Sequence, residues 1–261
     1  MSPSTVHYFY NPVVHRFYAP DLDPSKPTVA LRPDEARHLT RVLRLVPGAI
    51  VGVFDGKGRE FVARVDATLG DRVSLEILEP LRTAAESTLA ITLAQAVLKA
   101  DKMDNVVRDA VMLGVTTIQP VVSSRAETSV AALQKARRVA RWRRIAVASA
   151  KQCGRARVPD VQEPVMLDVM LTRASGSAVE LKLALVEPSQ HQGRSLETLR
   201  AGPRPTAALV LVGPEGGWKP QEIAQFSAGG FHLVTLGSRT LRAEAAPVAV
   251  LILLQFIWGD L

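Results

Sequence analysis

The feature that most constrains the fold is a pair of apolar runs near the C-terminal end, each ended by a glycine-containing loop. The first run, residues 207–212, is followed by Gly213-Pro214-Glu215-Gly216-Gly217, and the second, residues 231–236, by residues 237–244. An apolar run stopped by glycine is typical of a strand buried on both faces of a parallel sheet. Because ligands of such sheets bind beyond the carboxyl ends of the strands, the two loops are predicted to form one ligand site.

The chain upstream of these loops alternates apolar runs with helical patterns. Strands are expected at residues 89–97, 115–122 and 181–186, and helices at 101–113 and, as one long helix, at 129–153. This alternation predicts an α/β domain with a mostly parallel sheet and helices on both faces. The apolar stretch 245–258 is shorter than the roughly 20 residues of a membrane span. We therefore expect a buried helix there and no association with a membrane.

The N-terminal part has a different pattern. Residues 28–31, 50–54, 60–65 and 72–78 read as short strands, with hairpin chemistry at 55–58. Pro33 with acidic residues after it predicts a helix that buries Ala36, Leu39, Val42 and Leu43. A compact β-barrel with one helix is expected. The polar stretch 79–88 marks a boundary, so we predict one domain at residues 1–80 and another at 85–261.

Positive charge is concentrated in one segment. The chain has 32 Lys and Arg against 25 Asp and Glu, a net charge of +7, and its pI is near 9.9. Residues 135–157 contain nine basic residues and no acidic one. Such a segment attracts polyanions, and a nucleic acid is the first candidate partner. The alternative is a solvated helix face, although such a face usually mixes both signs of charge.

Other features narrow the function class. Cys153 is the single cysteine, so an intramolecular disulfide is impossible and a cytoplasmic location is expected. The five histidines have no metal-ligand spacing, and no metal is predicted. The N-terminus lacks the pattern of a signal peptide. The first glycine loop matches neither the dinucleotide nor the phosphate-binding fingerprint, which disfavours a small-molecule enzyme with a nucleotide cofactor.

Several motifs occur together in order along the chain. They are Gly213-Pro214-Glu215-Gly216-Gly217, Leu236-Gly237-x-Arg239-x-Leu241-Arg242-x-Glu244, His38-x-x-Arg41-Val42-Leu43-Arg44, Phe54-Asp55-Gly56, Leu113-Gly114-Val115, Ser124-Arg125, Gln152-Cys153-Gly154-Arg155 and Arg157-Val158-Pro159. This set resembles the RsmE family, the small-subunit ribosomal RNA uridine-N3 methyltransferases of the SPOUT superfamily. One departure is Ala245, where the family usually has threonine.

The resemblance implies a fold and an activity. Residues 1–80 would form a PUA-like RNA-binding β-barrel domain, and residues 85–261 a SPOUT domain with a C-terminal trefoil knot that binds S-adenosylmethionine. The implied reaction is methylation of N3 of a uridine in 16S ribosomal RNA, in the assembled small ribosomal subunit, by a homodimer. Two alternatives stay open: a methyltransferase of the same superfamily that acts on another RNA such as transfer RNA, and a non-catalytic RNA-binding assembly factor.

The resemblance also implies site residues. The cofactor would contact the two loops and the strand ends before them, at Leu211, Val212, Gly213, Pro214, Glu215, Gly216, Gly217, Leu236, Gly237, Leu241 and Arg242. RNA would contact the basic residues of the family motifs, His38, Arg41, Arg44, Arg155 and Arg157. The basic segment itself predicts further RNA contacts at Arg137, Arg141 and Arg144.

The reaction itself suggests catalytic residues. Uridine N3 must lose a proton, and the negative charge then spreads over two carbonyl oxygens. An arginine beside those oxygens stabilises the anion but cannot be the base, since it is always protonated. We therefore assign Arg242 and Arg125 to stabilisation of the substrate. Glu244 or Glu215 is expected to accept the proton or to organise the loops.

Overall fold

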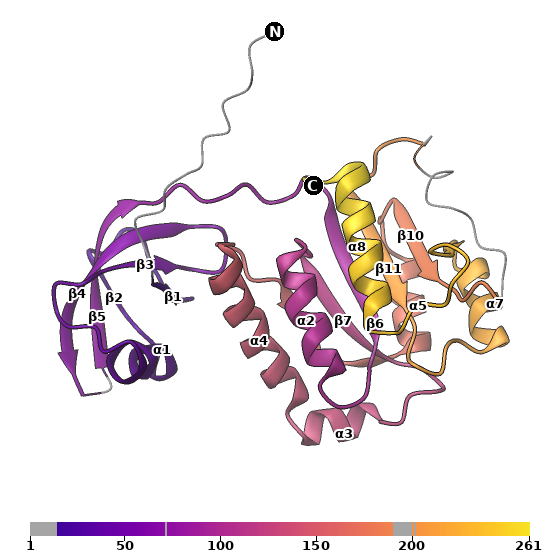
Figure 1. The fold of residues 1–261 in the computed structure, drawn as a ribbon, viewed down its shortest axis with the longest axis horizontal. Coiled ribbons are helices and arrows are strands. Elements are labelled where there is room, and N and C mark those ends of the chain that lie inside the picture. Colours follow the sequence, from indigo (N-terminus) through magenta and orange to yellow (C-terminus); the bar gives the residue numbers. More distant parts are fainter. Residues whose placement is uncertain (1–14, 71, 190–199, 201) are drawn as a thin grey trace, which may run out of the picture. The chain divides into compact units, whose positions relative to one another are not determined.

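The structure is a computed structural model that describes residues 15–70, 72–189, 200 and 202–261. The chain forms two compact units (Figure 1). The first comprises residues 1–84 together with 154–157, and the second comprises residues 85–153 and 158–261. The chain therefore leaves the second unit after Cys153, adds four residues to the first unit and returns.

The first unit is a five-stranded sheet with one short helical segment. Its elements are β1 (Arg16–Tyr18), β2 (Thr28–Ala30), α1 (Pro33–Arg37), η1 (His38–Val42), β3 (Ile50–Phe54), β4 (Glu60–Leu69) and β5 (Arg72–Pro80). The strand order is β1-β3-β4-β5-β2, and all pairings are antiparallel except that of β1 with β3. Phe17, Leu39, Val53 and Leu75 are among the buried residues of its core. The predicted β-rich unit is confirmed.

The helical segment of this unit differs from the prediction. The α-helix α1 ends at Arg37 and continues as η1, a π-helical turn in which the Leu43 N–H donates to the His38 carbonyl oxygen at 3.0 Å. A π turn closes over five residues instead of four, so α-helical spacing no longer sets which side chains share a face. Leu39 is buried as expected, but Val42 is 66% exposed and its predicted burial is wrong.

A buried ion pair fixes the returning segment within the first unit. Arg16 Nε lies 2.7 Å from Glu60 Oε1, and the two side chains are only 8% and 3% exposed. Arg16 Nη2 also donates to the Arg155 carbonyl oxygen at 3.0 Å, and the Gly58 N–H donates to the Ala156 carbonyl oxygen at 3.1 Å. Arg155 and Arg157 therefore belong to the first unit, although they lie in the same basic run as residues 135–151.

The second unit is a seven-stranded sheet between two layers of helices (Figure 1). Its strands are β6 (Ala90–Ala96), β7 (Thr117–Val122), β8 (Asp160–Val161), β9 (Val165–Met166), β10 (Leu181–Leu185), β11 (Ala207–Val212) and β12 (His232–Val234). Their order is β12-β10-β11-β6-β7-β8, with β9 also paired to β7, and every pairing is parallel in the residues described. The predicted mostly parallel sheet is confirmed.

Six helices are described in the second unit: α2 (Lys102–Met112), α3 (Val130–Lys135), α4 (Arg138–Cys153), α5 (Leu167–Ser175), α7 (Pro220–Ala228) and α8 (Ala245–Trp258). Alternate strand residues enter two different cores. Leu93 and Val210 pack with residues of α2, α4 and α8, whereas Ala94 and Leu211 pack with residues of α5 and α7. This two-sided burial explains why the strands are continuously apolar in sequence.

Two helices differ from the expectation. The single helix predicted over 129–153 is two helices, α3 and α4, because Arg137 between them has a positive φ of 50° that α-helical geometry does not accommodate. The helix predicted at 245–258 is present as α8, but it is not buried all round. Its side chains Ile252, Leu253 and Phe256 are 42%, 38% and 66% exposed. In the described part of the chain, no helix combines the length and apolar character needed to cross a bilayer.

Two ion pairs of the first unit allow a matched test of burial. We expect Arg16→Met to destabilise this unit by about 3–5 kcal/mol, because Glu60 then stays buried without its cation. Arg64→Met should cost less than about 1 kcal/mol, since the Arg64–Glu76 side chains are 49% and 43% exposed. The three tryptophans, at 142, 218 and 258, lie in the second unit, so tryptophan fluorescence would not report unfolding of the first unit. Hydrogen exchange of the amides of β3 and β4 is therefore the suitable measurement. Equal loss of protection in both variants would contradict this expectation.

Candidate active site

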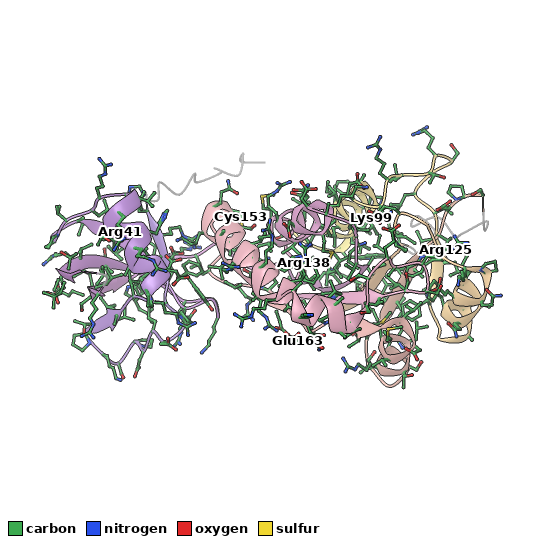
Figure 2. The ribbon with its side chains drawn as sticks, turned by 90° about the horizontal axis from the view of Figure 1, so that it is seen from below. Arg41, Lys99, Arg125, Arg138, Cys153 and Glu163 are labelled. Carbon is green, nitrogen blue, oxygen red and sulfur yellow. The ribbon has the colours of Figure 1, made fainter. Side chains whose placement is uncertain are left out.

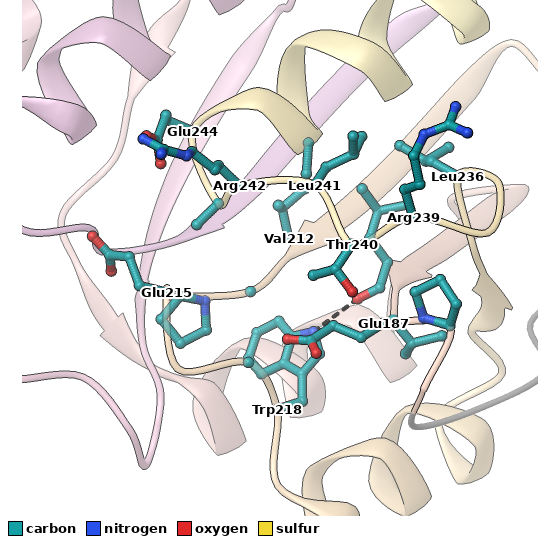
Figure 3. Close-up of a pocket in the computed structure, with 18 of the residues that line it drawn as sticks. Glu187, Val212, Glu215, Trp218, Leu236, Arg239, Thr240, Leu241, Arg242 and Glu244 are labelled. Atoms are coloured by element: carbon teal, nitrogen blue, oxygen red, sulfur yellow. Dashed lines mark hydrogen bonds between the residues drawn. The ribbon is translucent and has the colours of Figure 1, made fainter.

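A cavity of about 390 Å³ lies at the carboxyl ends of β10, β11 and β12 in the second unit (Figure 3). It is lined by Lys102, Leu185, Val186, Glu187, Pro188, Val212, Gly213, Pro214, Glu215, Gly217, Trp218, Val234, Leu236, Arg239, Thr240, Leu241, Arg242, Ala243, Glu244 and Ala246. The strands that precede the two glycine loops, β11 and β12, are not neighbours, because β10 lies between them. The end of β10 therefore completes the cavity with residues 185–188.

Trp218 fixes one wall of the cavity. Its Nε1 donates to the Leu185 carbonyl oxygen at 2.9 Å, and its ring meets the Phe226 ring edge-on at 4.9 Å between centroids. A Cβ atom at position 213 would lie 3.1 Å from this indole, so a larger residue there would have to displace the Trp218 ring by a few tenths of an ångström. Gln95 Nε2 donates to the Gly213 carbonyl oxygen at 3.3 Å and holds the start of the loop.

Lys102, the first residue of α2, lies between carboxylates of the two glycine loops. Its Nζ is 3.4 Å from Glu215 Oε1 and 3.5 Å from Glu244 Oε2. Glu244 Oε2 is buried and has no hydrogen bond, so its contact with Lys102 is an ion pair only. One ammonium group thus joins loops that follow two strands separated by a third.

The environment of Glu215 keeps it ionised. Burial raises the pKa of Glu215, but hydrogen bonds from its own backbone, from the Lys99 N–H at 3.2 Å and from Lys102 outweigh burial, so the pKa lies below its ordinary value. A carboxylate with a lowered pKa is a weak proton acceptor at neutral pH. Of the two alternatives given above for Glu215, these contacts favour organisation of the loop.

The arginines of the second loop extend in different directions. Figure 3 shows the Arg242 side chain beside Glu244, whereas Arg239 extends on the side of Leu236. Arg125 does not line this cavity. It follows β7 and lies across Gly216, with its Nη1 donating to the Gly216 carbonyl oxygen, and it lines a second cavity on the other side of the loop. Arg242 and Arg125, both assigned to the substrate, therefore face different cavities.

Most residues expected to contact a cofactor line the first cavity. The exceptions are Leu211, which packs in the core against α5 and α7, Gly216, which lines the second cavity, and Gly237, which lines neither. Ala245 is not among the lining residues either. The sequence reasoning missed Lys102, Trp218 and the end of β10. The apolar run 181–186 predicted that strand, and its place in the sheet would have identified its end as a wall.

Glu222 is a further residue that the sequence reasoning missed. It is 6% exposed on α7 and accepts from the Ser124 N–H at 3.0 Å and the Lys219 N–H at 2.8 Å. It thereby ties the segment before Arg125 to the segment after Gly217. The signal was present, because a proline followed two residues later by glutamate is typical of the first turn of a helix, where the carboxylate can accept from a backbone N–H.

The residues expected to contact RNA are divided between the two units. His38, Arg41, Arg44, Arg155 and Arg157 belong to the first unit, and Arg137, Arg141 and Arg144 to the second. His38 packs edge-on against Phe17, and Arg41, labelled in Figure 2, has an exposed side chain.

The basic segment has acidic partners from elsewhere in the chain. Arg141 Nη2 lies 2.6 Å from Asp104 Oδ2 of α2, and the same carboxylate accepts from Trp142 Nε1 at 3.1 Å. Arg143 pairs with Glu163 at 3.2 Å. Arg137 and Arg144 are exposed, and the hydrogen bond described for the Arg144 side chain goes to Ala140 of its own helix. The positive charge of α4 is therefore partly neutralised.

Comparisons with known proteins identify the family. Residues 85–255 match the model of an RNA methyltransferase domain, and residues 31–78 match that of an RNA methyltransferase PUA domain. Ribosomal RNA small subunit methyltransferase E of Synechocystis sp. is 32% identical over 86% of this chain and 71% of its own. The crystal structure of ribosomal RNA small subunit methyltransferase E from Neisseria gonorrhoeae, bound to S-adenosyl methionine, is 38% identical with a TM-score of 0.83 over 94% of this chain and 98% of its own.

A methyltransferase from Legionella pneumophila, in complex with the bound cofactor SAM, has a TM-score of 0.85 and 31% identity over 94% of this chain and 98% of its own. A PUA-type first unit followed by a parallel α/β unit with a cavity at its strand ends is thus the architecture of a class of RNA methyltransferases. The chain belongs to the ribosomal RNA small subunit methyltransferase E family, and its resemblance to the RsmE family is confirmed.

Removal of the shared ammonium group should loosen both loops at once. In Lys102→Met, Glu215 and Glu244 face each other without a cation, and we expect the loops at 213–217 and 237–244 to lose about 1 kcal/mol of local stability, or about fivefold in amide protection. Lys102→Arg should retain most of the protection, since it keeps the charge. Hydrogen exchange measured by mass spectrometry tests this. Loss of protection in one loop alone would show that Lys102 does not couple the two.

Proposed function

We propose that this protein transfers a methyl group from S-adenosylmethionine to N3 of a uridine in 16S ribosomal RNA, in the assembled small subunit. Family membership supports the class of reaction, and the names of the curated relatives support the substrate. The observation that carries the proposal is the cavity at residues 185–188, 212–218 and 234–246, because it lies where ligands of parallel sheets bind.

The lining of this cavity fits S-adenosylmethionine. Trp218, Leu236 and Leu241 offer apolar walls for a flat heterocycle, while the carboxylates of Glu187, Glu215 and Glu244 suit a ligand with a cationic sulfonium and an ammonium group. Its volume of about 390 Å³ lies within the roughly 300–1,000 Å³ of small-molecule sites. When bound, this group supplies a methyl carbon that is open to attack by a nucleophile.

The side chains have separate tasks in this proposal. Arg242 lies on the rim and would stabilise the negative charge on the uracil oxygens, and Arg125 would act on the RNA from the other side of the loop. Glu244 is the stronger candidate for the proton acceptor, because the contacts of Glu215 keep its pKa low. Lys102 would then act as a positioning residue that holds both carboxylates.

RNA would be bound by both units. In the first unit we assign His38, Arg41, Arg44, Arg155 and Arg157 to this role, and in the second Arg137, Arg141 and Arg144. Arg141 already has a carboxylate partner, so its contribution to RNA binding should be smaller than those of Arg137 and Arg144. A cytoplasmic location and the trefoil knot implied by the family resemblance belong to the same proposal.

We also propose that the protein works as a homodimer. The exposed face of α8 supports this, because Ile252, Leu253 and Phe256 place contiguous apolar surface on one side of a helix. Met112 at the end of α2, which packs beside α8, is 42% exposed as well. A second copy of this chain, with the same apolar face, is the occupant that the family resemblance implies.

The reaction can be tested in a strain that lacks this gene. We expect its 16S ribosomal RNA to lack N3-methyluridine, the wild-type gene to restore the nucleoside, and Arg242→Ala to restore less than about 1% of the wild-type rate, as for loss of one oxyanion-type contact. Mass spectrometry of nucleosides and a methylation assay with isolated small subunits provide the readouts. Arg173→Ala, an exposed arginine on α5, is the control. Normal methylation by a folded Arg242→Ala variant would refute the role of Arg242. If the strain that lacks this gene instead loses N3-methyluridine from transfer RNA, the substrate is transfer RNA.

The dimer can be tested independently of activity. Phe256 is 66% exposed, so Phe256→Lys should leave the fold of the monomer intact while it places a charge in the proposed interface. We expect light scattering to give the mass of a dimer for the wild type and that of a monomer for this variant. Leu261→Lys, also at an exposed apolar residue, serves as a control for added charge. Equal masses in all three proteins would contradict a dimer through α8.

A further inference from the structure

The second cavity, of about 490 Å³, lies on the opposite side of the Pro214–Gly216 loop from the first. Its wall is apolar where it meets the core, at Leu98, Leu133 and Trp142, all buried. Its remaining lining comes from residues 97–100, 125–128, 132, 136, 138 and 214–216. Pro214 and Glu215 line both cavities, so one short loop separates them.

The charges on this cavity are not balanced. Lys99 Nζ pairs with Glu127 at 2.5 Å, and Glu215 pairs with Lys102, so these carboxylates already have cations. Arg125 donates to a neutral carbonyl oxygen, that of Gly216. Arg138, at the start of α4, has no hydrogen-bond or ion-pair partner among the described residues. Two guanidinium groups without a carboxylate partner among the described residues therefore line one cavity; Figure 2 labels both residues.

Guanidinium groups that have no carboxylate partner suit one class of ligand. Arginine binds phosphate oxygens through two parallel N–H groups and is the usual residue where phosphate recognition needs a defined geometry. The cavity exceeds the lower limit of about 300 Å³ for a small-molecule site and has an apolar wall, so it has room for a nucleoside as well as a phosphate.

We propose that this cavity is a subsite for a nucleotide of the acceptor RNA next to the methylated uridine, with backbone phosphates of that segment on Arg125 and Arg138. The inference rests on the proposed function, since the RNA in the second cavity is the proposed acceptor of the methyl group bound in the first. The loop that holds Glu215 then contacts the methyl donor on one side and the RNA chain on the other. Arg138 becomes a substrate-binding residue that no sequence motif indicated.

Filter binding of unmodified 16S ribosomal RNA at several salt concentrations tests the subsite. Arg138→Gln should weaken binding roughly tenfold at low salt and make the log–log salt slope less steep by about one, as for one lost phosphate contact. Arg173→Gln is the matched control, because it removes an exposed arginine outside the cavity. Ala132→Trp would fill the cavity and leave every charge in place, and it should weaken RNA binding without changing the slope.

Calorimetry with S-adenosylmethionine and light scattering separate the possible outcomes. Both variants should bind this cofactor and assemble as the wild type does, with a raised KM for RNA in the methylation assay. If Arg138→Gln and Arg173→Gln have equal RNA affinities and slopes, the subsite is refuted. It is also refuted if the variants change only cofactor affinity or only the mass of the assembly. A wild type that binds RNA but not the cofactor would refute the proposed function, while the RNA comparison would still decide the subsite.

Discussion

The candidate site depends on an ammonium group shared by two carboxylates. Lys102 at the start of α2 pairs with Glu215 after β11 and with Glu244 after β12, although β10 lies between these strands. Backbone hydrogen bonds within the sheet cannot bring such loops together, because each strand pairs only with its neighbours. Lys102, on the helix between β6 and β7, contacts both loops through its side chain.

The remaining supports act on the same loops by different means. Gln95 holds the Gly213 carbonyl oxygen, Trp218 fills the space that a side chain at position 213 would need, and Glu222 joins the two segments beside Arg125. These are buried groups with short polar contacts, whereas the cavity side chains Arg239 and Arg242 are exposed. Such a division suits a site in which the backbone stays fixed and the charged groups on the rim move to meet a large substrate.

The sequence predicted the features that arise from periodicity and from glycine. Parallel strands, the helix at 245–258 and the small β unit followed from apolar spacing, and the two glycine loops indicated the cavity. It could not predict the strand order, so the wall formed by residues 185–188 was missed. Two predictions from apolar spacing failed because of local backbone geometry. The π turn leaves Val42 exposed, and the positive φ of Arg137 divides the predicted helix at 129–153 into two. Lys102 carried no signal, because a lone lysine at a helix start is usually a solvated residue.

The basic run at residues 135–157 shows why charge counted along a sequence differs from charge in space. Arg141 and Arg143 are paired with Asp104 and Glu163, residues distant in sequence, and the last two arginines of the run belong to another unit. Among the described residues of α3 and α4, no carboxylate pairs with Arg137, Arg138 or Arg144. A polyanion is attracted by uncompensated charge rather than by the number of basic residues. The RNA contact of the second unit should therefore depend on these unpaired arginines, and at Arg138 such a charge coincides with the volume of the cavity beside the Pro214–Gly216 loop.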